Sequence, residues 1–272
     1  PDGSRLAYLA QQDALEIELY TVAPDGSTNV KASGALVAFR TVTIFQWSPD
    51  GRRLAYRKDQ DTDNVFELYS VAPDGTGNVK VSGTLVAGGD VDFDFQWSPD
   101  GSRLAYRADQ DTDTVKELYT VAPDGSANAR VSGALVDGGG VGDYRWSPDS
   151  SRLAYRADQD TDDVDELYTV APDGSGNVRV SGALVAGGNV GFNYLWSPDG
   201  SRLAYLADHD ADNLRELYTV APGGSTNPRR VSGTLVTGGS VFDYRWSPDG
   251  SRLAYLAQQD ALEIELYTVA PD

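Results

Sequence analysis

The sequence Trp97-Ser98-Pro99-Asp100-Gly101-Ser102-Arg103-Leu104-Ala105-Tyr106 recurs almost unchanged along the chain. Further copies begin at Trp47, Trp146, Trp196 and Trp246, and a sixth copy, without the Trp-Ser pair, runs from Pro1 to Tyr8. The spacings between successive tryptophans are 50, 49, 50 and 50 residues. A fixed period of this length is typical of repeat architectures, in which one unit cannot bury its apolar face alone. We therefore expect one closed array over residues 1–272, with units at about 1–40, 41–90, 91–139, 140–189, 190–239 and 240–272.

Each unit contains four strand signals separated by turns. In the unit of Trp97, the first segment alternates apolar and polar residues, which is the period of a strand, and Pro99, Asp100 and Gly101 then form a turn signal. The expected strands are 91–97, 103–108, 117–122 and 128–132, followed by a Gly-rich crossing at 133–140. No segment has a helical period. Four antiparallel strands in about 50 residues describe the blade of a β-propeller.

The Trp-Ser-Pro-Asp-Gly turn followed by Arg-Leu-Ala-Tyr resembles the TolB-type, WD-like propeller repeat, and the resemblance covers essentially the whole chain. It implies an all-β propeller of four-stranded antiparallel blades. The family includes periplasmic scaffold proteins, extracellular binding modules and the propeller halves of some peptidases, so the resemblance implies a fold more specifically than a function.

The number of blades has two possible readings. Six copies of the motif predict six blades, with the first and last incomplete, and TolB-type propellers usually have six. However, residues 1–25 are identical to residues 248–272, so the sequence closes on itself after five units. In a five-bladed ring the two half-blades would compete for one place, and the displaced copy could pair with another molecule. Six blades is the favoured prediction.

The composition excludes several classes of partner. The net charge is −19, whereas nucleic acids and anionic membranes need a basic surface. No run of 18 apolar residues could span a membrane, and the absence of Cys removes disulfides and thiolate metal sites. An acidic surface suits cations, a basic partner or a salty environment. We expect a periplasmic or extracellular protein and, because residue 1 lies inside a motif copy, a processed chain or part of a longer one.

Acidic loops between the second and third strands form the most chemically suggestive motif. Carboxylates at positions 1, 3, 5 and 9 of these loops suit a hard cation such as Ca²⁺, as in the calcium hairpins of integrin-type propellers. The predicted ligands are Asp59, Asp61, Asp63, Glu67, Asp109, Asp111, Asp113, Glu117, Asp158, Asp160, Asp162, Glu166, Asp208, Asp210, Asp212 and Glu216.

Two departures weaken the calcium hypothesis. Position 6 carries Asn64, Thr114, Asp163 or Asn213 instead of Gly, and no Glu stands at position 12. The alternative is a solvated polar turn. The mutual repulsion of three Asp side chains favours an ion, although bulk salt could also offset it. The terminal loops, at Asp13 and Asp260, have lost the pattern and should not bind.

Other polar and aromatic residues recur too regularly to mark a unique site. The turn Asp and strand Arg of each motif, such as Asp100 and Arg103, are interpreted as structural pairs, and the tryptophans as core between blades. A group three residues before each Trp could form a polar ring at a channel mouth or bond neighbouring backbone. This group consists of Asp94, Asp143, Asn193 and Asp243, and Ile44 interrupts it.

Nothing in the sequence marks an active site. His209 is the only histidine, and neither a nucleophile elbow nor a Cys accompanies it. We therefore predict a non-enzymatic binding or scaffold module that meets a protein or small ligand at a propeller face or channel mouth. One alternative is a structural or designed repeat array that self-associates through its duplicated terminal strands. Another is the propeller part of a larger secreted enzyme.

Overall fold

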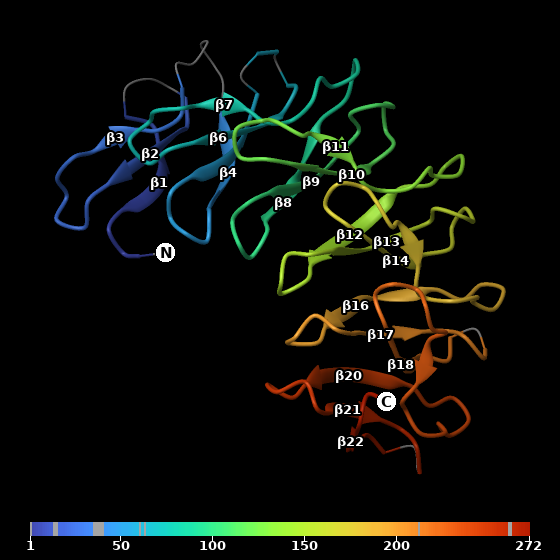
Figure 1. Cartoon of the computed structure of the whole chain (residues 1–272). Coiled ribbons are helices and arrows are strands. Elements are labelled where there is room, and N and C mark those ends of the chain that lie inside the picture. Colours follow the sequence, from blue (N-terminus) through green and yellow to red (C-terminus); the bar gives the residue numbers. More distant parts are fainter. Residues whose placement is uncertain are drawn as a thin grey trace. The chain divides into compact units, whose positions relative to one another are not determined.

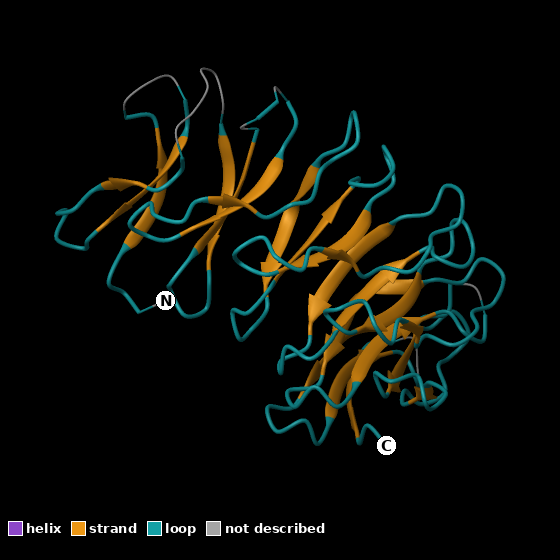
Figure 2. Ribbon diagram, turned by 45° about the horizontal axis from the view of Figure 1, so that its top comes forward, coloured by secondary structure: helices purple, strands orange, loops and turns teal. Residues whose placement is uncertain are grey.

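The chain is all-β in a computed structural model that describes residues 2–12, 16–34, 41–59, 61–62, 64–211, 213–260 and 263–272 (Figures 1 and 2). The described residues form 22 strands and no helix. The strands belong to six antiparallel sheets. By its contacts the chain divides into two compact units, residues 1–131 and 132–272, each with three sheets. The predicted all-β blade pattern is confirmed.

The first unit contains one three-stranded and two four-stranded sheets, with strands that pair in chain order. The first sheet consists of β1 (Leu6–Ala10), β2 (Glu18–Val22) and β3 (Val30–Lys31). The second consists of β4 (Val42–Trp47), β5 (Leu54–Lys58), β6 (Glu67–Val71) and β7 (Val79–Lys80). The third consists of β8 (Val91–Trp97), β9 (Leu104–Ala108), β10 (Glu117–Val121) and β11 (Ala129–Arg130).

The second unit contains two four-stranded sheets and a final three-stranded one. The fourth sheet consists of β12 (Val141–Trp146), β13 (Leu153–Ala157), β14 (Glu166–Val170) and β15 (Val178–Arg179). The fifth consists of β16 (Val190–Trp196), β17 (Leu203–Ala207), β18 (Glu216–Val220) and β19 (Arg229–Arg230). The sixth consists of β20 (Val241–Trp246), β21 (Leu253–Ala257) and β22 (Glu265–Val269).

The motif turn forms as its residues predict. Gly101 has φ +71°, in the left-handed region where glycine meets no Cβ penalty. Ser150 occupies the same position in the next copy with φ +62°, which costs backbone strain. The turn leads the chain from β8 into β9, so that Trp97 lies opposite Leu104 in the ladder.

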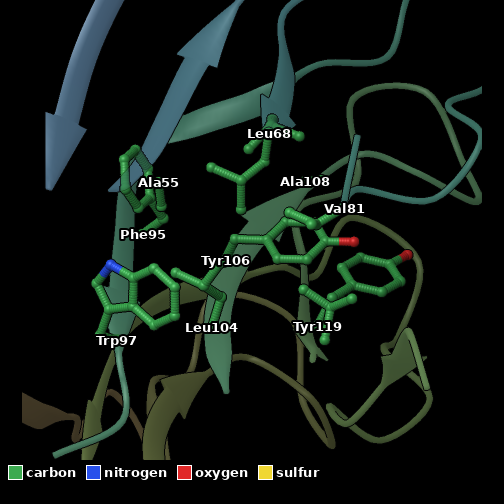
Figure 3. Packing of buried hydrophobic residues seen from close by; sticks show 11 residues of the cluster. Ala55, Leu68, Val81, Phe95, Trp97, Leu104, Tyr106, Ala108 and Tyr119 are labelled. Atoms are coloured by element: carbon green, nitrogen blue, oxygen red, sulfur yellow. The ribbon is translucent and has the colours of Figure 1, made fainter. Parts of the chain in front are cut away.

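Buried residues from neighbouring sheets share one core. Around β9, fully buried Phe95, Leu104 and Tyr106 contact Leu68 of the preceding sheet (Figure 3). Tyr106 and Tyr119 stack with ring centroids 5.4 Å apart. Trp97 is 8% exposed and its indole Nε1 donates to the Gln46 carbonyl of the preceding sheet at 3.4 Å. The prediction that the tryptophans belong to the core between blades is therefore confirmed for Trp97.

The two identical half-blades occupy separate sheets. Residues 1–25 provide β1 and β2 of the first sheet, and residues 248–272 provide β21 and β22 of the sixth. The first sheet lacks a first strand among the described residues, and the sixth lacks a fourth strand there. Six blade sheets, the favoured of the two sequence readings, is therefore the arrangement observed.

Candidate functional site

The carboxylate at position 9 of each acidic loop is buried at the start of the third strand, where a basic residue of the fourth strand meets it. In the third sheet, Glu117 accepts hydrogen bonds from Arg130 Nη1 at 2.6 Å and from the Tyr119 hydroxyl at 2.7 Å. Glu117 is 4% exposed, so this ion pair is largely withdrawn from water. The same pair recurs as Lys80–Glu67 (2.7 Å), Arg179–Glu166 (2.5 Å) and Arg230–Glu216 (2.6 Å).

The same basic residue also reaches the Asp at position 3 of its loop. Arg230 Nη1 lies 2.8 Å from Asp210, and its hydrogen bond to Glu216 helps to raise the pKa of the guanidinium above its ordinary value. The equivalent distances are 3.4 Å for Lys80–Asp61, 3.7 Å for Arg130–Asp111 and 3.3 Å for Arg179–Asp160. Each loop therefore offsets part of the repulsion between its carboxylates with a cation of the protein itself.

The Asp at position 1 is bonded to the crossing segment between blades. Asp109 Oδ1 accepts from the Asp90 backbone N–H at 2.5 Å and from Lys116 Nζ at 3.0 Å. Although burial opposes ionisation, these bonds hold the pKa of Asp109 below its ordinary value. Asp59 accepts from the Thr41 N–H at 2.9 Å, and Asp158 from the Gly140 N–H at 2.5 Å. Asp208 at this position is also buried.

The sharp turn of the loop forms without glycine. At position 6, Asn64, Thr114, Asp163 and Asn213 all have positive φ, between +56° and +68°. Such values are uncommon outside glycine, and most of all for β-branched Thr. The missing Gly therefore does not prevent the turn geometry that the calcium hypothesis requires.

The predicted calcium ligands are only partly brought together. At position 5, Asp113 and Asp162 lie beside the crossing-segment glycines Gly88 and Gly138, whereas Asp63 and Asp212 fall outside the described residues. Within the described part of the chain, no three carboxylate or imidazole groups converge closely enough to hold a metal. Ca²⁺ binding at these loops stays a prediction.

The acidic residues three before each Trp bond mainly to side chains. Asp143 Oδ2 lies 3.0 Å from Arg156 Nη2, and Asp243 Oδ1 lies 2.6 Å from Arg245 Nη1. Asp94 Oδ1 lies 3.5 Å from the Gln96 amide. These three Asp residues bond to neighbouring groups, as the alternative to a polar ring predicted. The partners shown are side chains, whereas backbone groups were expected.

The first strands expose large aromatic side chains, a feature that the sequence analysis missed. Phe93, Phe192 and Phe242, each four residues before its Trp, are 62%, 67% and 49% exposed. Alternation along β8 places Phe93 on the same face as buried Val91 and Phe95. The pairing of β8 with β9 shifts register between Val91 and Phe95, as in a β-bulge, and the shift turns Phe93 outwards.

Arginines of the second strands accompany two of these rings. The Arg57 guanidinium lies between the rings of Phe66 and Phe93, 3.8 and 4.1 Å from their centroids, and that of Arg156 lies 4.7 Å from Phe192. Cations over aromatic faces in this way are attracted by the ring quadrupole. We call Phe93, Phe192 and Phe242 the first-strand aromatic residues.

A small cavity adjoins Phe192 in the second unit. Its volume is about 150 Å³, and Arg156, Asp165, Asn189, Phe192, Asp208 and Arg215 line it. Arg156 Nη1 lies 2.6 Å from Asp165, yet burial raises the pKa of the Asp165 carboxyl above its ordinary value. The cavity thus combines one exposed ring with the Arg156–Asp165 ion pair.

His209 occupies the loop position that Gln holds in sister blades. Its Nε2 lies 3.4 Å from the Tyr205 hydroxyl, and its ring lies 4.3 Å from that of Tyr218. Burial lowers the pKa of the imidazole below its ordinary value. These contacts are those of a residue packed among tyrosines.

Comparison with solved structures defines the fold. Oligogalacturonate lyase from Vibrio parahaemolyticus matches at 15% identity over 97% of this chain and 74% of its own, with a TM-score of 0.55. Dipeptidyl peptidase 4 from Porphyromonas gingivalis matches at 13% identity over 99% of this chain and 42% of its own, with a TM-score of 0.68. Both are propeller proteins. The fold is a β-propeller.

The comparisons go no further than the fold. A putative TolB from Agrobacterium tumefaciens matches at 19% identity over 83% of this chain and 76% of its own, but its TM-score of 0.46 is too low to carry an argument. No family model and no curated protein matches the chain. The described residues contain no helix with the length and apolar character needed to cross a membrane.

Proposed function

We propose that this chain is a non-enzymatic binding or scaffold module, periplasmic or extracellular, that meets its protein or small-molecule partner through the first-strand aromatic residues, Phe93 in the first unit or Phe192 and Phe242 in the second. The observation that carries the proposal is the exposure of Phe93, Phe192 and Phe242, between 49% and 67% each. Exposed aromatic rings beside arginines are the kind of surface on which binding energy concentrates.

The contrast between repeated and divergent positions supports this assignment. The third strand reads Glu-Leu-Tyr-Thr-Val in five of six sheets, and its Glu pairs with a basic residue in each complete blade. A contact repeated in each blade serves the fold. The first strands differ from one another, as in VTIFQW, VDFDFQW, VGDYRW, VGFNYLW and VFDYRW. Divergence at these positions provides the asymmetry that recognition of one partner requires.

A displayed library of random peptides tests the binding proposal without knowledge of the natural partner. We expect selected peptides to lose at least about tenfold in affinity, about 1.4 kcal/mol, for the triple variant Phe93→Ser, Phe192→Ser, Phe242→Ser. The side chains are exposed, so the variant should keep the wild-type melting temperature. Leu6→Ser, which changes an exposed apolar residue elsewhere, is the control. Selected peptides that bind the triple variant and wild type equally would contradict the proposal.

We also propose that the four acidic loops bind Ca²⁺ weakly. The carboxylates and the left-handed residue at position 6 favour the ion, but it must compete with Lys80, Arg130, Arg179 or Arg230 for the same oxygens. We therefore expect dissociation constants of about 10⁻⁴–10⁻³ M, as for extracellular modules.

Titration calorimetry on chelator-stripped protein at moderate ionic strength measures this binding. We expect about four ions per chain and a rise in melting temperature with Ca²⁺, because the ion binds the folded loops and not the unfolded chain. The combined variant Asp61→Ala, Asp111→Ala, Asp160→Ala, Asp210→Ala should lose both effects. An absence of heat and of any thermal shift at millimolar Ca²⁺ would leave the loops as solvated turns.

Two further candidates are favoured by separate observations. The duplicated half-blade supports a structural array, natural or designed, that closes or assembles through its terminal strands. The likeness to a peptidase, of which this chain spans 42% of the length, supports the propeller part of a larger secreted enzyme. Light scattering separates the first of these from a monomeric binding module, and the length of the native gene tests the second.

A further inference from the structure

The first strands of the third and fifth sheets begin in the same backbone frame. In the third sheet, Asp90 Oδ1 accepts from the Phe66 N–H at 2.6 Å, and in the fifth sheet Asn189 Oδ1 accepts from the Asp165 N–H at 2.7 Å. The next residue of each strand, a valine, donates its N–H to the carbonyl of the same partner, at 2.8 and 2.9 Å. Each frame lies within one compact unit, so the two can be compared position by position.

In the third sheet, this frame holds a carboxylate of the protein itself. Asp92 Oδ2 lies 3.0 Å from Arg107 Nη2, and Asp92 Oδ1 lies 3.4 Å from Lys116 Nζ. Lys116 also lies 3.0 Å from Asp109, so a second carboxylate beside the ammonium does not prevent Asp92 from binding there. The position after the valine therefore defines a place where a carboxylate meets basic groups.

In the fifth sheet, the corresponding place is a cavity. Gly191 stands where the third sheet has Asp92, and the cavity of about 150 Å³ is lined by Gly191, Phe192 and Arg215. Apart from its chain neighbours, a Cβ at Gly191 would meet no atom closer than 3.6 Å, so a side chain fits there. Because a water molecule occupies only about 30 Å³ in the liquid, the cavity has room for a carboxylate group.

The cavity keeps one basic group for such a carboxylate. Arg215 occupies the position of Lys116, whereas Leu206 replaces Arg107. In the part of the chain that the structure describes, Arg215 forms no ion pair, although Arg156 on the same cavity is paired with Asp165. A guanidinium binds a carboxylate through two parallel hydrogen bonds, so Arg215 is suited to an anionic group from outside the chain.

We propose that this cavity binds the carboxylate group of a ligand, which Arg215 holds as Lys116 holds Asp92. The inference deepens the proposed binding function and rests on it, because the same ligand would contact Phe192, whose exposed ring lines the cavity. Two sources share this chemistry: a small free carboxylate and an acidic side chain of a partner protein.

Chemical-shift titration of the nitrogen-15-labelled chain at constant ionic strength tests the site. Acetate represents the free carboxylate, and the blocked peptide acetyl-Gly-Glu-Gly-amide represents the acidic side chain. We expect saturable shifts at Gly191, Phe192 and the Arg215 guanidinium with both probes, and none with acetyl-Gly-Gln-Gly-amide. The probe that binds more tightly identifies the source.

Two variants should remove this binding by different routes. Arg215→Gln should weaken acetate binding at least about tenfold, because a neutral amide replaces the cation. Gly191→Asp should abolish acetate binding, because the introduced carboxylate would occupy the cavity beside Arg215, as Asp92 lies beside Lys116.

Matched controls make the same charge changes elsewhere in the second unit. Arg229→Gln alters an exposed residue of β19, and Gly223→Asp alters a turn whose counterpart in the preceding blade carries Asp173. A Cβ at Gly223 would meet no atom within 4 Å. Both controls should bind acetate as the wild type does.

Shifts that grow linearly with acetate and spread over the surface would overturn the carboxylate site. Saturable shifts of equal size in the wild type, Arg215→Gln and Gly191→Asp would overturn it as well. Both results leave open whether selected peptides need the first-strand aromatic residues, which the triple phenylalanine variant tests separately. Acetate binding at Arg215 together with peptides that tolerate the triple variant would retain the carboxylate site and overturn the proposed ligand surface.

Discussion

Leu19→Ala is expected to lower the free energy of unfolding by about 2–5 kcal/mol, because it leaves a cavity in a close-packed core. Leu19 is fully buried and packs with Val42, Leu54 and Tyr56. The same substitution at its twin, Leu266→Ala, should change the free energy by less than about 0.5 kcal/mol, because that side chain is already exposed to water. Sequence context is identical at the two positions, so packing alone accounts for the difference.

Urea unfolding monitored by tryptophan fluorescence measures both variants against wild type, at a protein concentration low enough to keep the chain monomeric. The midpoint should fall for Leu19→Ala and stay unchanged for Leu266→Ala. Equal effects of the two substitutions would mean that both half-blades are covered alike, against the six-sheet arrangement.

Lys58→Ala is expected to stabilise the protein at pH 7. Lys58 is fully buried at the end of β5, where the sister strands end in Ala108, Ala157, Ala207 and Ala257. Burial lowers the pKa of the Lys58 ammonium from 10.5 to about 8, against the opposing effect of Glu18. Such a pKa shift corresponds to about 3 kcal/mol of destabilisation of the folded state by the charged ammonium. Because Lys58→Ala also removes the packing contacts of the side chain, we expect the free energy of unfolding to rise by about 1–3 kcal/mol.

The destabilisation by the Lys58 ammonium depends on pH in a predictable direction. The folded chain binds the Lys58 proton less tightly than the unfolded chain, so this destabilisation is fully present below pH 8 and is lost as the pH rises towards 10.5. The stability difference between Lys58→Ala and wild type should therefore shrink over that interval. Lys58→Met, which keeps the side-chain length, should show the same pH dependence. A difference that stays constant from pH 7 to 10.5 would contradict an ionised buried lysine.

Most of the fold could be predicted from the sequence because one motif recurs with a fixed period. The strand expected at 103–108 is observed as Leu104–Ala108, and the one at 117–122 as Glu117–Val121. The fourth strand is shorter than the expected 128–132, with only Ala129–Arg130 in the ladder. The pairing of this strand with β10 extends over two residues, since the chain then turns into the crossing segment.

The candidate sites were less predictable because they depend on contacts between elements. Positions 1, 3 and 9 of the loops were identified, but the bonding of positions 3 and 9 to Arg130 and its equivalents was not. A usable signal was present: a Lys or Arg follows the Glu by 13 residues in β7, β11 and β15 and by 14 in β19. The alternation of apolar and polar residues could not predict the exposure of Phe93, because a register shift inside β8 turns this side chain to the opposite face of the strand.

Hydrogen exchange with and without a selected peptide tests most directly whether the first strands form the ligand surface. We expect slower amide exchange upon binding in β8, β16 and β20, which carry Phe93, Phe192 and Phe242, and unchanged exchange in the acidic loops such as 109–117. Protection confined to those loops or to the terminal strands β1 and β22 would contradict a ligand surface on the first strands.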